Sequence, residues 1–280
     1  MSLDSAPRRT QSDPRTQLAV FTGLGWLVGS AAAVASLSQW IVPPGRLDAP
    51  GVEYILAPAA FGIGNAATVL IGELALRRRL GRIREVSLVK RTIVGIADRW
   101  VLVLFAVSLL FVVAVVAVGA ALSGSDGQSF AHGEPGSYRF PSSDVTVGIF
   151  PGPHYGVTML VAVLAVVVTS AIVLQLIARR PALDDPDVDS YLRRLSAHRV
   201  LRAGTAALLV TGAGGGFLAS VAVAEAFATG PGHVIGMVAA GASVAIAFLG
   251  LVVLVLPCPR RSVPTPSALD EMDLHTADQA

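Results

Sequence analysis

The sequence contains several apolar runs that are long enough to cross a lipid bilayer, and arginine-rich segments separate them. The clearest run covers residues 100–122, which are almost all Val, Leu, Ala and Phe. A helix needs about 20 consecutive apolar residues to cross the hydrocarbon core. The whole chain is 53% apolar and only 14% charged, with a mean hydropathy of +0.66, whereas soluble domains carry about 25% charged residues. The sequence therefore predicts an integral membrane protein.

The apolar runs predict an all-α bundle of six transmembrane helices. We expect spans at 17–42, 52–76, 100–122, 155–177, 201–227 and 234–256, within a membrane domain over residues 17–257. The polar, proline-containing tails 1–16 and 258–280 are expected to be disordered. The first span has an alternative, because Ala33, Val34 and Ala35 have the small-x-small form of a signal-peptide cleavage site. The run continues to Val42, which favours a span.

The arginine-rich connectors predict the direction of the spans. Lys and Arg close to span ends stay on the cytoplasmic side, so segments 77–99 and 179–202 and both termini are expected to be cytoplasmic. Of the 21 Lys and Arg residues, only Arg46 and Arg139 then lie outside. This bias accounts for the net charge of +2 and the pI near 9.0 without a nucleic-acid partner. We expect the protein in the plasma (inner) membrane.

Each cytoplasmic connector is predicted to contain a short amphipathic helix. In the first connector, apolar residues recur at steps of three and four from Ile83 to Ile96. In the second, Asp187 or Asp189 can cap a helix that presents Tyr191 and Leu192 on its apolar face. The cations of both helices are expected to face anionic lipid headgroups or a protein partner. They are Arg82, Arg84, Lys90, Arg91, Arg193 and Arg194.

Two polar residues within the second span are the candidate binding residues. Intramembrane polar groups are the usual mark of function. Asn65 is the first candidate, although an interhelical hydrogen bond for packing is the alternative. Glu73 is the second, near the inner end, where it can pair with Arg77 or Arg78. Pro58 frees backbone groups that need partners, so this span is expected to pack inside the bundle.

No residue pattern indicates a catalytic, cofactor or metal site. The sequence has no glycine-rich phosphate loop, HExxH or Gly-x-Ser-x-Gly motif. The histidines lie outside the spans and lack ligand spacing, which argues against a haem relay and a metal site. The single cysteine, Cys258, excludes an internal disulfide. We therefore expect no cofactor and no enzymatic activity.

The aromatic residues of segment 123–154 favour a partly ordered cap over the outer mouth of the bundle.

Two further hypotheses stay open at this stage. A shift of 103 residues places span 52–76 on span 155–177 and Arg77 on Arg180, which indicates either an internal repeat or a match by composition alone. The favoured function is a permease-like transport or export component, with a cytoplasmic ATPase or another membrane protein as a partner. The alternative is a non-enzymatic scaffold, assembly factor or regulator, because so few polar residues lie within the spans.

Overall fold

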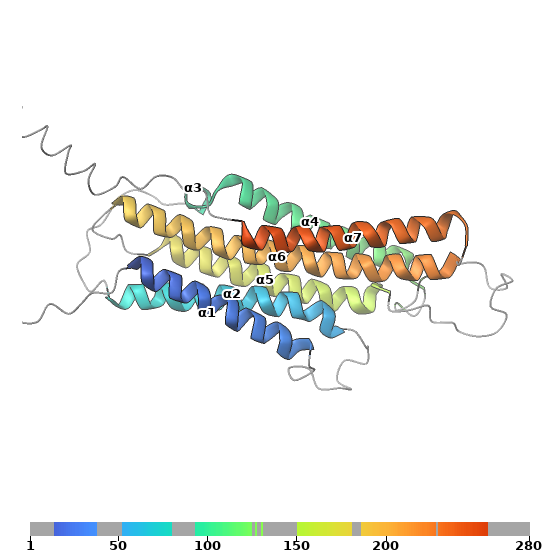
Figure 1. The fold of residues 1–280 in the computed structure, drawn as a ribbon, viewed down its shortest axis with the longest axis horizontal. Coiled ribbons are helices and arrows are strands. Elements are labelled where there is room, and N and C mark those ends of the chain that lie inside the picture. Colours follow the sequence, from blue (N-terminus) through green and yellow to red (C-terminus); the bar gives the residue numbers. More distant parts are fainter. Residues whose placement is uncertain are drawn as a thin grey trace, which may run out of the picture.

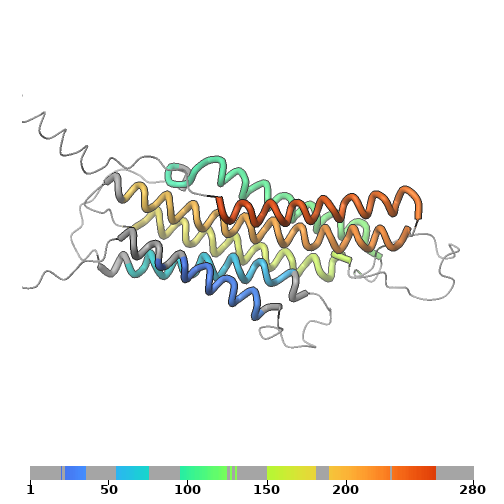
Figure 2. Tube along the Cα trace, in the orientation of Figure 1, coloured from blue at the N-terminus to red at the C-terminus, as the bar shows by residue number. Residues whose placement is uncertain are grey.

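Helices make up the computed structural model, which describes residues 14–37, 52–79, 93–124, 127, 130, 150–180, 186–227 and 229–256 (Figures 1 and 2). The helices are α1 (Pro14–Leu37), α2 (Val52–Arg79), α3 (Ile93–Ile96), α4 (Arg99–Leu122), α5 (Pro153–Ala178), α6 (Pro186–Phe227) and α7 (Pro231–Val255). The described residues include no β-strand, and an isolated bridge joins Ser123 to Phe130. The prediction of an all-helical chain is confirmed.

Five of the helices are long and apolar enough to cross a membrane. They are α2, α4, α5, α6 and α7. The apolar part of α1 is shorter, at Gly23–Ala35. The first span was predicted to reach residue 42, but the described helix ends at Leu37, and residues 38–51 lie outside the described part of the chain. A membrane-embedded helical bundle is therefore supported.

The second predicted amphipathic helix is not a separate element. Residues 187–195 form the first turns of α6, which has 42 residues and is about 63 Å long at 1.5 Å per residue. That is about twice the thickness of a hydrocarbon core. No proline or glycine lies between Asp187 and Leu201, so nothing interrupts the helix. The first predicted amphipathic helix lies mostly outside the described residues, which include only α3 from that connector.

The bundle has a central group of helices and two peripheral ones (Figure 1). Helices α2, α5 and α6 pack against one another and α4 packs on α5 and α6, whereas α1 packs mainly on α2 and α7 mainly on α6. About half of the apolar window is buried in α2 (50%) and in α6 (56%), against 22% in both α4 and α7. The expectation that the proline-containing second span packs inside is therefore confirmed. The low burial of α4 and α7 leaves apolar faces suited to lipid.

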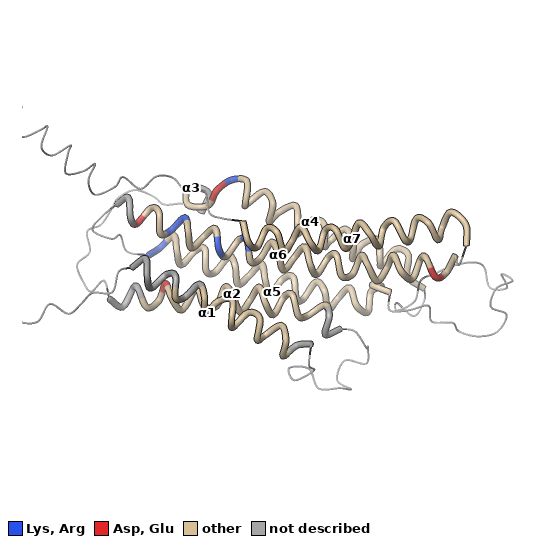
Figure 3. Tube along the Cα trace, viewed as in Figure 1, with Lys and Arg blue, Asp and Glu red and all other residues tan. Residues whose placement is uncertain are grey.

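The arginines gather at one end of the bundle, which we call the charged end (Figure 3). It is the end where α4 and α6 begin and where α2 and α5 finish. The arginines with described side chains there are Arg99, Arg179, Arg180, Arg193, Arg194, Arg199 and Arg202. The opposite end of α6 carries the exposed Glu225. This one-sided distribution is what the positive-inside rule requires of a membrane protein.

The glycines of α6 allow other helices to approach it. A Cβ atom built on Gly212 would lie 2.7 Å from the Phe111 ring of α4, and one on Gly215 would lie 2.8 Å from Met159 of α5. Gly214, between them, faces open space. The lack of a side chain at Gly212 and Gly215 therefore serves helix packing.

Candidate functional site

A cluster of buried charges joins three helices at the charged end. The Arg180 guanidinium follows α5 and lies 3.1 Å from Glu73 Oε2 on α2 and 2.9 Å from Asp189 Oδ1 on α6. Arg193 Nε lies 2.8 Å from Asp189 Oδ2, and Ser196 Oγ donates to Glu73 Oε1 at 2.8 Å. All five side chains are buried. We call these residues the charged cluster. Its two carboxylates and two guanidiniums balance in charge, as burial requires.

Arg193 also closes the end of α5. Its guanidinium donates to the carbonyl oxygens of Ile177 and Ala178, and to that of Arg180 at 2.6 Å. The last carbonyls of a helix lack partners within the helix, and a cation there interacts favourably with the helix dipole. Arg193 was predicted to face lipid or a partner, but its side chain is buried within the protein. The reason is that the carbonyl oxygens at the end of α5 and the Asp189 carboxylate of α6 accept hydrogen bonds from its guanidinium.

Glu73 and Asn65 are both buried, but they belong to different sites. Glu73 joins the charged cluster through Arg180, a residue 107 positions away. The side chains of Arg77 and Arg78, its predicted partners, lie outside the described residues. Asn65 lies two turns earlier on α2 and lines a pocket between α2 and α6. Neither residue has been tested as a binding residue, so that part stays a prediction.

Of the remaining predicted cations, only one can be placed. Arg194 is half-buried near the start of α6. Arg82, Arg84, Lys90 and Arg91 lie outside the described part of the chain. Their proposed contact with lipid or a partner therefore stays a prediction.

The pocket that Asn65 lines is basic and lies at the charged end. It has a volume of about 370 Å³ between α1, α2, α6 and the end of α7. Its lining residues are Trp26, Asn65, Leu195, His198, Arg199, Arg202, Ala203, Leu254, Val255 and Leu256. Arg202 is positioned by hydrogen bonds from its guanidinium to the carbonyl oxygens of Val253 and Leu254, which close α7. We call this the basic pocket.

His198 is the most unusual residue of the basic pocket. Its side chain is 1% exposed, and neither ring nitrogen has a hydrogen-bond partner among the described residues. Asp98 Oδ2 lies 3.8 Å from Nδ1, beyond hydrogen-bond distance. The Trp100 ring packs edge-on against the imidazole, with ring centres 5.6 Å apart. A buried polar group without a hydrogen bond is costly, so it indicates a ligand or water that completes the site.

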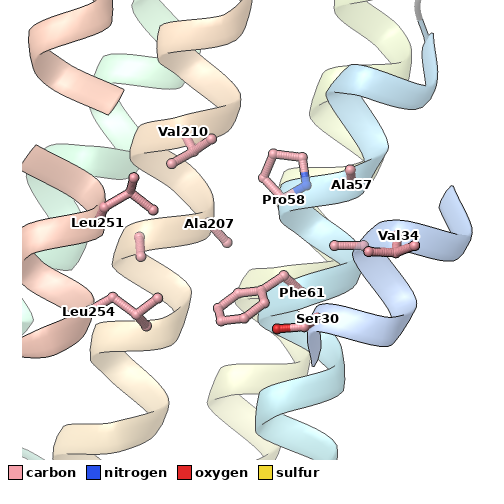
Figure 4. Close-up of a pocket in the computed structure, with 11 residues that line it drawn as sticks. Ser30, Val34, Ala57, Pro58, Phe61, Ala207, Val210, Leu251 and Leu254 are labelled. Carbon is pink, nitrogen blue, oxygen red and sulfur yellow. The ribbon is translucent and has the colours of Figure 1, made fainter. Parts of the chain in front are cut away.

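An apolar pocket lies next to the basic pocket, nearer the middle of α6. It has a volume of about 360 Å³, and α1 and α2 form one wall while α6 and α7 form the other (Figure 4). The Phe61 ring and the Ser30 side chain point toward the space between the walls. Its lining residues are Ser30, Ala33, Val34, Ala57, Pro58, Phe61, Ala206, Ala207, Val210, Leu251 and Leu254. We call this the apolar pocket.

The two pockets adjoin each other, because Leu254 lines both of them. On α2, Asn65 of the basic pocket and Phe61 of the apolar pocket are four residues apart, and therefore share a helix face. Trp26 and Phe61 meet at the junction, with ring centres 6.0 Å apart and ring planes at 72°. We call the combined feature the side groove.

Three other buried hydroxyl groups of the spans are satisfied within their own helices, whereas Thr205 Oγ1 has no hydrogen bond among the described residues. Ser108, Ser220 and Ser243 each donate to a carbonyl of their own helix, at 2.7, 2.6 and 3.0 Å respectively. Serine hydroxyl groups within helices commonly donate to a backbone carbonyl oxygen one turn earlier. The centre of the bundle is filled by apolar residues, including Val112, Met159 and Val166.

At the end opposite the charged end, little of the predicted cap can be placed. Most of segment 123–154 lies outside the described residues. Phe130 and Phe150 do pack together, with ring centres 5.4 Å apart. His154 packs against Tyr155, and His233 Nδ1 lies 2.9 Å from the carbonyl oxygen of Ala224. Among the described residues, no group of three or more potential ligands could hold a metal ion.

The sequence analysis singled out Glu73 and Arg193 of the charged cluster and Asn65 of the basic pocket, but it did not predict Arg180, Asp189, Ser196 or His198 as site residues. Asp189 and Arg193 carried a local signal, because acid and base four residues apart meet on one helix face. The pairing of Glu73 with Arg180, and the position of His198 in one pocket with Asn65, had no local signal in the sequence.

No protein-family model, curated protein or solved structure matches this chain.

Proposed function

We propose that this protein is a permease-like component of transport or export that receives its cargo from the bilayer through the side groove. The observation that carries this proposal is the position of the groove. It runs between two helix pairs, α1 with α2 and α6 with α7, instead of through the bundle. The centre is filled with apolar side chains, so a polar solute would have no favourable route there. A groove that is apolar for much of its length suits a hydrophobic or amphiphilic cargo.

The arrangement of the helices supports movement at the groove. Helix α1 packs mainly on α2, and α7 mainly on α6. The charged cluster joins α2 and α6 to the end of α5 and includes no residue of α1 or α7. We propose that α1 and α7 move relative to α2 and α6, and so change the width of the groove, while the cluster keeps α2, α5 and α6 together. Movements of one helix group against another underlie many transport cycles.

Proteoliposomes that contain the purified protein test this proposal. We expect a fluorescent phospholipid analogue to change leaflets faster than in protein-free liposomes. Val34→Trp, which fills the apolar pocket, should return the rate to the protein-free value. Val161→Trp is the matched control, because Val34 and Val161 are both 62% exposed and Val161 lies away from the groove. Equal rates with and without protein, for anionic and zwitterionic analogues alike, would overturn the proposal.

We further propose that the protein lies in the plasma (inner) membrane, with the charged end facing the cytoplasm. The support is the gathering of arginines at that end (Figure 3). In a Cys258→Ser background, a cysteine at exposed Ser190 should resist a membrane-impermeant maleimide in intact cells. A cysteine at exposed Thr229, at the opposite end, should react. The reverse labelling pattern would contradict this orientation.

A non-enzymatic scaffold, assembly factor or regulator is the second proposal. It rests on the cations Arg82, Arg84, Lys90 and Arg91, which lie outside the described residues. Of the two predicted partner-facing cations in the described part of the chain, Arg194 is half-buried and Arg193 is buried. The groove favours the transport proposal, because a scaffold would need no pocket between its helix pairs.

A further inference from the structure

We propose that the side groove binds an anionic phospholipid, with the phosphate of its headgroup in the basic pocket and an acyl chain in the apolar pocket. This inference rests on the proposed function, since it assigns a cargo class to the same groove. Four kinds of observation carry it: a buried histidine without a hydrogen bond, the charge of the pocket, the apolar character of its continuation and the length of the groove.

The histidine provides a hydrogen-bonding group that the protein itself does not satisfy. His198 lines the basic pocket and is 1% exposed, and both of its ring nitrogens lack a hydrogen bond among the described residues. A neutral imidazole carries one N–H donor, and an imidazolium carries two. A phosphate oxygen in the basic pocket would accept from this ring. Asn65, on the opposite wall, adds an amide that can donate to the same headgroup.

The positive charge of the basic pocket favours an anionic ligand. Arg199 and Arg202 line it together with His198, and its lining residues in the described part of the chain include no Asp or Glu. Asp98 approaches His198 to 3.8 Å but does not line the pocket. Guanidinium groups form short, charge-assisted hydrogen bonds with phosphate oxygens. Basic pockets between transmembrane helices are a recurrent kind of binding site for anionic lipid headgroups.

The apolar pocket identifies the anion as part of a lipid instead of a free phosphate. It adjoins the basic pocket at Leu254 and is lined almost entirely by apolar side chains (Figure 4). A soluble anion would leave this pocket unfilled, whereas an acyl chain would cover it. On α6 the groove extends from Leu195 to Val210, which is about 22 Å at 1.5 Å per residue. The hydrocarbon core is about 30 Å thick, so one groove accommodates a headgroup and a chain from one leaflet.

The position of the pocket along the bundle agrees with a headgroup at the membrane surface. The basic pocket lies where α7 ends, at Leu254, Val255 and Leu256, while the first turns of α6 extend beyond it. Arg202 is held there by the carbonyl oxygens that close α7. Trp26 also lines this pocket, and tryptophan is typical of the membrane interface. This position suits a headgroup in the basic pocket and an acyl chain in the apolar pocket.

Native mass spectrometry of the full chain in neutral detergent tests the inference. Phosphatidylglycerol and phosphatidylcholine with identical acyl chains are titrated separately, with glycerol phosphate as a headgroup-only probe. We expect phosphatidylglycerol to bind about tenfold more tightly, the effect of one charge-assisted hydrogen bond. Arg199→Gln should remove most of that preference. Arg194→Gln, the matched control on the same helix, lies outside the pocket lining and should keep it.

Two further variants test the contributions of the headgroup and of the acyl chain separately. His198→Ala should also reduce the preference for phosphatidylglycerol. Val34→Trp should weaken the binding of both lipids, whereas Val161→Trp should not. Thermal unfolding of each variant identifies loss of fold. Equal affinity for the two lipids, or equal effects of Arg199→Gln and Arg194→Gln, would overturn the inference. Competition by glycerol phosphate as strong as that by the lipid would also overturn it, because the occupant would then be a soluble anion.

The outcome of this binding experiment is independent of the outcome of the transport experiment in proteoliposomes. A tenfold preference for phosphatidylglycerol in a protein that moves no lipid in proteoliposomes supports the binding inference and overturns the transport proposal. Lipid movement without any preference between the headgroups supports transport and overturns the binding inference.

Discussion

Arg180→Ala should destabilise the detergent-solubilised protein by about 3–5 kcal/mol, the usual cost of removing one partner from a buried ion pair. The Arg180 side chain is 1% exposed and lies between Glu73 and Asp189. Without it, the two buried carboxylates lose the cation that they share, and α2, α5 and α6 lose a common contact. Thermal unfolding followed by far-UV circular dichroism measures the change.

The adjacent arginine provides a control for this experiment. Arg179 is exposed, so Arg179→Ala removes the same chemical group at the neighbouring position without breaking the cluster. We expect a change of less than about 0.5 kcal/mol, as is usual for surface substitutions. A double-mutant cycle with Glu73→Ala then isolates the pair, since residues in direct contact show non-additive effects. Similar unfolding curves for Arg180→Ala and Arg179→Ala would show that the charged cluster does not stabilise the bundle.

Gly236→Ala should loosen the contact between α7 and α6, with a cost of about 1–3 kcal/mol, as is common for overpacking. A Cβ atom built on Gly236 would lie 2.6 Å from the backbone nitrogen of Ala224 and 2.7 Å from the carbonyl oxygen of Ser220. Because both contacts are with backbone, no side chain can rotate away, and the helices must separate. The same thermal unfolding measurement detects the loss.

Gly241→Ala is the matched control on the same helix. A Cβ atom at Gly241 meets nothing within 4 Å, so this substitution should leave the unfolding temperature unchanged. If Gly236→Ala were equally neutral, the close approach of α6 and α7 would not depend on glycine, and the wall of the side groove formed by α7 would be more adaptable than the structure indicates.

The helices were predictable because their signal is local. A run such as 100–122 is apolar at nearly every position, and only a helix satisfies all backbone groups of a span in lipid. Proline at 58 and glycine in the second span indicated a buried helix, and the structure agrees. The ends of helices were less predictable. Residues 187–195 carried an amphipathic pattern that also suits the exposed beginning of a longer helix, and α6 is continuous there.

The candidate sites were less predictable because their contacts are distant in sequence. Glu73 was singled out as a buried acid, but its contact with Arg180 depends on how α2 packs beside the end of α5. Arg193 was predicted to face outward from its charge alone, yet the carbonyl oxygens that end α5 surround it. His198 was placed among loop residues, and only the packing of α6 beside α2 brings it into a pocket with Asn65.

The sequence by itself determined that this chain is helical, that it belongs in a membrane and that its cations favour one side, because apolar length and charge bias act residue by residue. Only the tertiary structure decided which charges neutralise one another and where a groove remains between helix pairs. Both depend on the positions of helices that are far apart in the chain, and a buried charge can be paired or left facing a pocket with the same local sequence around it.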